Sequence, residues 1–149
     1  MKKIIALIRY YYIKIKLRGL RIPKISYIGD RTKIIIKGTG KIICAGKIRM
    51  DTGSELESSG SLIIGDHFVL NPYSRVGAHN QITIGSNVVI ARFVSILDHD
   101  HAFKQVDGNL VFEGYTSAPV KIGNNVWIGD KVTIVKGVSI NLFKCMVMI

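Results

Sequence analysis

Aliphatic residues recur every six positions along much of this 149-residue chain. Glycine follows several of them, and a second small or branched residue often lies four positions after the leading one. An amphipathic helix would repeat every three or four residues, and a strand of a β-sandwich would alternate every two. The period of six predicts neither. The positions that keep it are Ile64, Leu70 and Val76, then Ile84, Ile90 and Ile96, then Ile122, Ile128, Ile134 and Ile140.

Units of six residues predict a parallel β-solenoid of triangular cross-section. Each unit supplies one short strand and one turn, three units close a coil, and the leading aliphatics stack in the core. Glycine after the aliphatic permits close approach at the corner. Isoleucine and valine dominate the apolar residues, and their branched side chains suit strands. We therefore predict an all-β fold.

The pattern also predicts where the solenoid begins and where it is interrupted. A first unit is visible at Ile28-Gly29-Asp30, so residues 25–149 are assigned to the solenoid domain. The repeat is absent from residues 102–118, which predicts one loop extruded from a coil. Long loops in compact domains are usually functional, and we expect this one to cover a bound substrate.

Residues 1–24 form a separate basic segment. They contain eight lysines and arginines, no acidic residue precedes Asp30, and the whole chain has a formal charge of +11. Charges interrupt the apolar stretch 4–22 too often for a membrane span, and it lacks the features of a signal peptide. We expect a helix or strand that packs on the core with its charges outward. The alternative is an amphipathic segment resting on an anionic membrane. No recognition motif accompanies the charge, so nucleic acid is not expected as a partner.

The two cysteines, Cys44 and Cys145, lack the spacing of a paired motif. We interpret them as reduced thiols and expect a cytoplasmic protein. A peripheral location at the inner face of the membrane is the alternative.

Two stretches identify a family resemblance, "ITIGSNVVIARFVSILDHDH" and "APVKIGNNVWIGDKVTIVKGVSI". They resemble the hexapeptide-repeat acyltransferases, in particular the maltose and galactoside O-acetyltransferases and the capsule or O-antigen acetyltransferases. The resemblance runs from about Ile28 to Ile140. It implies a left-handed parallel β-helix, a homotrimer, and transfer of an acetyl group from acetyl-CoA to a saccharide hydroxyl.

The resemblance places the family's catalytic histidine on His101, whereas His99 falls where the family tolerates other residues. A neutral imidazole can take a proton from a hydroxyl as the oxygen attacks the thioester, with no acyl-enzyme. A base is usually oriented by a third group, and both Asp98 and Asp100 flank the histidines. Which of them orients His101 stays open at this point.

The resemblance implies further site residues. Asn71 matches an asparagine that binds the acceptor and stabilises the transition state, although a corner asparagine of a β-helix would look the same. His79 stands where the galactoside enzymes carry an acidic acceptor contact, and Tyr115 of the loop is a candidate sugar contact. For the CoA donor, Trp127 matches a tryptophan beside the catalytic histidine. Asp130 falls where the galactoside enzymes carry a serine that contacts CoA, so an acidic residue at this position departs from the family pattern.

Three alternatives remain. A γ-carbonic-anhydrase-like zinc enzyme would use His79, His99 and His101, but that family's longer spacing is missing, so we expect no metal. A structural solenoid or a nucleotidyltransferase arm would bind through the basic N-terminus. Finally, relatives continue past the equivalent of Ile140 with a further coil, whereas here the period is kept only by Met146. A shortened, inactive β-helix with a structural or binding role is therefore the main rival.

Overall fold

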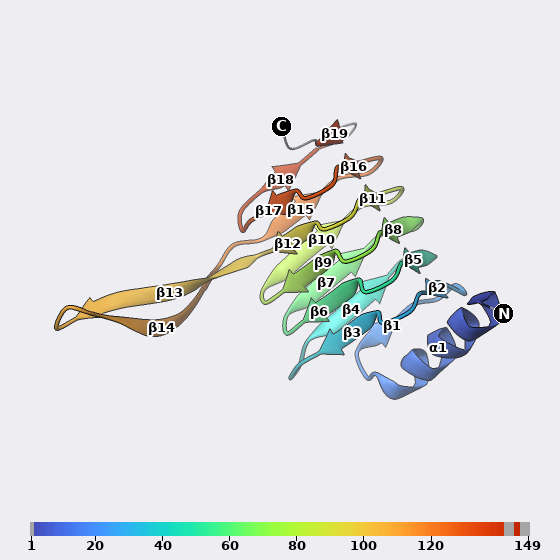
Figure 1. Ribbon diagram of the computed structural model, residues 1–149, viewed down its shortest axis with the longest axis horizontal. Coiled ribbons are helices and arrows are strands. Elements are labelled where there is room, and N and C mark those ends of the chain that lie inside the picture. Colours follow the sequence, from blue (N-terminus) through green and yellow to red (C-terminus); the bar gives the residue numbers. More distant parts are fainter. Residues whose placement is uncertain (1, 142–144, 147–149) are drawn as a thin grey trace.

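The computed structural model describes residues 2–141 and 145–146, and the chain winds into a β-solenoid with one helix at its N-terminal end (Figure 1). Three parallel sheets form its faces, and successive strands enter the first, second and third sheet in turn. The predicted all-β solenoid is thereby confirmed, and its triangular coil follows from the three-sheet order.

The strands are short, as six-residue units require. The first sheet contains β1 (Leu20–Arg21), β4 (Lys41–Cys44), β7 (Ser61–Ile64), β10 (Gln81–Ile84), β15 (Val120–Ile122) and β18 (Ser139–Ile140). The second contains β2 (Tyr27–Ile28), β5 (Ile48–Met50), β8 (Phe68–Leu70), β11 (Val89–Ile90), β16 (Trp127–Ile128) and β19 (Cys145–Met146). The third contains β3 (Lys33–Ile36), β6 (Glu55–Ser58), β9 (Arg75–Ala78), β12 (Ser95–Leu97) and β17 (Thr133–Ile134).

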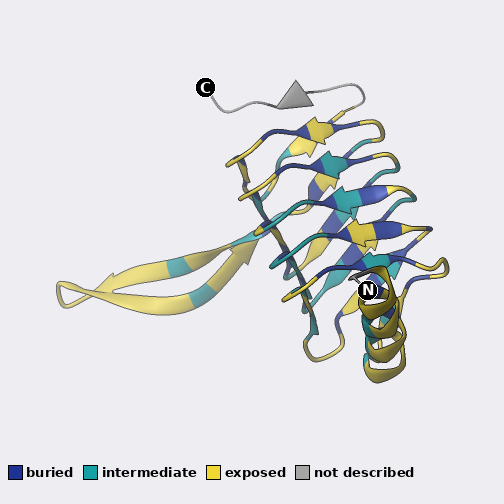
Figure 2. Ribbon diagram, turned by 45° about the vertical axis from the view of Figure 1, so that its right-hand side comes forward, coloured by how far each residue is buried: buried dark blue, intermediate teal, exposed yellow. Residues whose placement is uncertain are grey.

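The leading aliphatics of the six-residue pattern fill the interior. All the positions named for the pattern are buried, and those of neighbouring coils are in register, as Ile64, Ile84 and Ile122 are in the first sheet. Burying one such side chain stabilises the fold by about 1.5–3 kcal/mol. Figure 2 shows the result as a buried band through every coil. The period of six is therefore the period of the core.

Glycines let the coils approach one another at the corner between the first and second sheets. A β-carbon on Gly65 would meet the backbone of Gly85, and one on Gly85 would meet the backbone of Gly123. Neither site leaves space for a side chain, because backbone atoms of the next coil lie within 2.7 Å of the β-carbon position, and at Gly85 the Asn124 side chain lies closer still. The glycine after the aliphatic thus has the close-approach role that the sequence predicted.

The basic segment 1–24 is mostly helix α1 (Lys2–Lys16). Ala6 and Tyr10 are buried against the end of the solenoid, and the Tyr10 hydroxyl donates a hydrogen bond to the Ile22 carbonyl at 3.1 Å. The helix ends before Gly19, which adopts a φ of +86°, as glycine commonly does beyond a helix C-terminus. Strand β1 already pairs with β4, so the solenoid begins within this segment.

The predicted loop 102–118 is a β-hairpin. Strands β13 (His99–Val106) and β14 (Asn109–Ser117) pair antiparallel and project far from the coil (Figure 1). Asp107 and Gly108 form the turn with φ of +49° and +80°, the conformation that favours an Asp-Gly pair in a two-residue hairpin. The predicted extrusion is confirmed, but the segment forms a regular β-hairpin and not an irregular loop.

The C-terminal end is described only in part. Strand β19 places Met146 in register with Ile128, which agrees with the one position there that keeps the period. The question of a shortened final coil otherwise concerns residues 142–144 and 147–149, which lie outside the described residues.

Candidate active site

Three histidines and a tyrosine gather where the hairpin leaves the solenoid. His79 follows β9 and His99 begins β13, so they occupy the same corner of successive coils. Their rings are stacked, with centroids 3.6 Å apart and planes 5° from parallel. Tyr115, on β14, has its ring 4.7 Å from that of His79 and 5.0 Å from that of His101. The fold therefore brings together three of the predicted site residues, His79, His101 and Tyr115.

The carboxylate of Asp98 organises this corner. Asp98 is fully buried, and its two oxygens accept hydrogen bonds from the backbone N–H groups of His79 and Asn80, each at 2.8 Å. The Nδ1 atom of His99 lies 3.1 Å from the carboxylate. A buried carboxylate is tolerated when its oxygens are hydrogen-bonded, as they are here. When Nδ1 carries the proton of this contact, Nε2 of His99 is left as a proton acceptor.

His101 lies farther out along β13 and is exposed. Its neighbours are aromatic, with ring centroids of Phe103 and Phe112 at 6.2 and 5.7 Å. The carboxylate of Asp100 forms an ion pair with Lys136 at 2.8 Å. At this corner of the described chain, the acid in contact with an imidazole is Asp98, and the imidazole is that of His99.

Burial lowers the pKa of His79, and the neighbouring charge of His99 lowers it further. Two stacked imidazoles cannot both take a proton without bringing like charges together. Farther along the third sheet, Lys37 donates a hydrogen bond to Glu57 and lowers the pKa of that carboxyl. The lowered pKa keeps His79 neutral at neutral pH, and the carboxylate–lysine pair of Glu57 and Lys37 lies farther along the same sheet.

The other predicted site residues lie elsewhere in the coil. Asn71 and Asp130 are at the corner between the second and third sheets, and Trp127 is on β16, 46% exposed. The Asn71 Nδ2 donates a hydrogen bond to the Ile90 carbonyl at 2.7 Å, and Asp130 accepts hydrogen bonds from Arg92 that lower its pKa. One chain therefore holds its predicted site residues in two groups at two corners.

Sequence reasoning missed two features of these corners. One is the Asp98–His99 contact, and the other is an exposed stack of Tyr73 on Phe93, with ring centroids 5.5 Å apart. In both stacks, His79 on His99 and Tyr73 on Phe93, the partners are 20 positions apart, which is the length of one coil with its two-residue slip. This 20-residue period is the sequence signal that could have predicted which residues stack.

The stacked geometry of His79 and His99 also bears on metal binding. The nitrogens of parallel, overlapping rings lie in their own planes and do not converge on one point, as zinc ligands must. Within the described part of the chain, no group of three or more His, Cys, Asp or Glu side chains is arranged to hold a metal ion.

A solenoid of six-residue units is consistent with a hexapeptide-repeat acetyltransferase. Comparison with known proteins agrees. The chain is 32% identical over 114 residues to the "Putative lipopolysaccharide biosynthesis O-acetyl transferase WbbJ" of Escherichia coli. It is 35% identical over 81 residues to the "Probable acetyltransferase Rv3034c" of Mycobacterium tuberculosis, and 38% over 81 residues to the "Putative acetyltransferase YJL218W" of Saccharomyces cerevisiae. All three of these relatives are named as acetyltransferases, which confirms the predicted resemblance.

These matches cover part of each protein. They span 70% of this chain and 58% of WbbJ, whereas the other two span 54% of this chain and 27% and 40% of the relatives. No family model and no solved structure matches the chain.

Proposed function

We propose that this protein is an O-acetyltransferase that moves the acetyl group of acetyl-CoA to a hydroxyl of a saccharide. The observation that supports it best is the histidine cluster at the root of the hairpin, in a chain similar to a protein named as an O-acetyl transferase. The chain's charge of +11 favours a donor that carries phosphates. We further propose that Trp127 and Asp130 contact this donor, and that His79 and Tyr115 contact the acceptor.

In the proposed reaction, neutral His101 accepts the proton of the acceptor hydroxyl while the oxygen attacks the thioester carbonyl carbon. The C–O bond forms, the C–S bond breaks, and the imidazolium returns its proton to the CoA thiolate. Asn71 contributes through its amide: one N–H donates to Ile90, and the amide has a second N–H for the developing oxyanion.

The competing base is His99, because Asp98 holds its imidazole. The two histidines are therefore changed separately, and acetyl transfer is measured as CoA thiol release that requires the saccharide. His101→Ala is expected to lower kcat by about 10²–10⁴-fold, and His99→Ala to lower it much less.

Circular dichroism and mass in solution serve as folding controls for both variants. A larger loss in His99→Ala would move the base to the Asp98–His99 pair. Full activity in both variants would contradict histidine catalysis at this corner.

We also propose that the active unit is a homotrimer. His79, His101 and Tyr115 lie at one corner of the coil, and Asn71, Trp127 and Asp130 lie at or beside another, so the proposed site would need more than one chain. Chains packed side by side around a threefold axis would pair one corner of a subunit with a different corner of its neighbour. Acetyl-CoA would then lie between subunits.

We place the reaction in the cytoplasm. Cys44 is a buried free thiol, and burial raises its pKa to about 12, so it is unreactive as well as reduced. An unpaired cysteine in the core is typical of a protein from a reducing compartment.

A further inference from the structure

One face of helix α1 packs against the solenoid. Ala6 and Tyr10 are buried, and Ile13 packs against the same core. These residues are spaced by four and three, so they lie along one side of the helix. Because this side is anchored, the orientation of the opposite side is fixed relative to the solenoid.

The opposite side of α1 is apolar and faces outward. Ile4, Ile8, Tyr11 and Ile15 are spaced by four, three and four residues and are 64%, 63%, 47% and 85% exposed. Figure 2 shows the helix as mostly exposed along its outer side. A surface helix of a water-soluble domain normally turns polar residues to solvent, so an outward row of isoleucines indicates that this face is covered in use.

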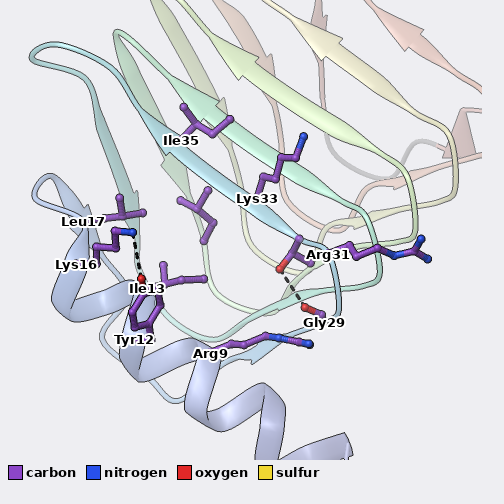
Figure 3. A pocket seen from close by; sticks show the side chains of 11 residues that line it. Arg9, Tyr12, Ile13, Lys16, Leu17, Gly29, Arg31, Lys33 and Ile35 are labelled. Carbon is purple, nitrogen blue, oxygen red and sulfur yellow. Dashed lines mark hydrogen bonds between the residues drawn. The ribbon is translucent and has the colours of Figure 1, made fainter.

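Cations line both flanks of this row, and α1 contains no acidic residue. Lys3 and Lys14 lie on one side. On the other, Arg9 and Lys16 border a cleft of about 390 Å³ between α1 and the first coil, to which Arg31 also contributes. Figure 3 shows these helix side chains facing the strand that carries Lys33 and Ile35. Arg9 forms an ion pair with Asp30 at 2.6 Å, which offsets one of these charges, so the rim keeps a net positive charge over an apolar floor.

We propose that α1 is a membrane-docking element that lies in the surface of an anionic phospholipid leaflet. Ile4, Ile8 and Ile15 would enter the acyl region, Tyr11 would sit at its edge, and the flanking cations would contact lipid phosphates. A second copy of the chain fits this face poorly, because two such helices would oppose cations with no acid between them. Within the described residues no helix is long and apolar enough to cross a bilayer.

The test is sedimentation of the purified full chain with vesicles. Binding is expected to vesicles of equal parts phosphatidylglycerol and phosphatidylcholine, and much less to phosphatidylcholine alone. The double variant Ile8→Asp with Ile15→Asp should bind the anionic vesicles about tenfold or more weakly. Lys3→Gln with Lys16→Gln should weaken binding and reduce its dependence on salt.

The matched control is Leu110→Asp with Val106→Asp, which introduces the same two charges at apolar residues that are 73% and 42% exposed near the hairpin tip. It should bind like the unchanged protein. Equal binding to neutral and anionic vesicles would overturn the proposal, as would unchanged binding of the double isoleucine variant. A change in solution mass in that variant, without any vesicle binding by the unchanged protein, would assign the face to chain association instead.

Discussion

At the scale of single residues, the corner at the hairpin root depends on one buried charge. Asp98 accepts hydrogen bonds from two backbone N–H groups of the preceding coil and contacts the imidazole of His99 in its own coil. The sequence showed only that two acids alternate with two histidines. Which acid turns inward depends on where β12 ends and the hairpin departs, and the local sequence does not specify that point.

The stacked pair His79 and His99 should make the fold sensitive to mild acid. Burial holds the pKa of His79 below the ordinary value of 6.5, so the unfolded chain binds a proton there more readily than the folded chain does. Stability is therefore expected to be greatest above pH 6.5 and to fall as the pH drops from there toward the folded-state pKa. Urea unfolding at pH 7.5 and pH 5 measures this.

The variant His79→Gln should show a smaller loss of stability between these two pH values than the unchanged protein. His67→Asn is the control, because His67 is an exposed corner histidine outside the stack. The lowered pKa values of Glu57 and Asp66 change stability at lower pH, so the loss expected between pH 7.5 and pH 5 is assigned to His79. An undiminished acid loss in His79→Gln would contradict the account of the stack.

At the scale of elements, the solenoid strands follow from the sequence because a single six-residue pattern fixes strand, corner and core together. The hairpin was harder to predict. Its strands have exposed side chains on both faces, so no burial pattern marks them, and only Asp107-Gly108 gave a local signal for the turn.

Helix α1 was difficult to predict for a different reason. Its apolar residues lie on two faces, one toward the core and one toward solvent, so the sequence alone does not present a simple amphipathic stripe. The charges that interrupt it flank the outward face. Only the placement of Ala6 and Tyr10 against the solenoid reveals which isoleucines are left outside.

At the scale of the whole molecule, the proposed site requires two chains, and mixing of variants tests this. His101→Ala and Asn71→Ala chains are each expected to be nearly inactive. Unfolded together in equal amounts and refolded, they should regain activity, because about one quarter of the interfaces then pair two intact corners. The mixed protein should have three times the 16.5 kDa mass of one chain.

Each variant refolded alone is the control for that experiment. Trimers that stay inactive after mixing would place the complete site within one chain, and a monomeric mass would contradict the trimer itself.

The central claim is that this protein uses acetyl-CoA, and calorimetric titration of acetyl-CoA into the purified chain tests it most directly. The account predicts saturable binding in the micromolar range, with free CoA binding at the same site. No heat of binding at millimolar acetyl-CoA would contradict an acetyltransferase and leave the solenoid as a scaffold.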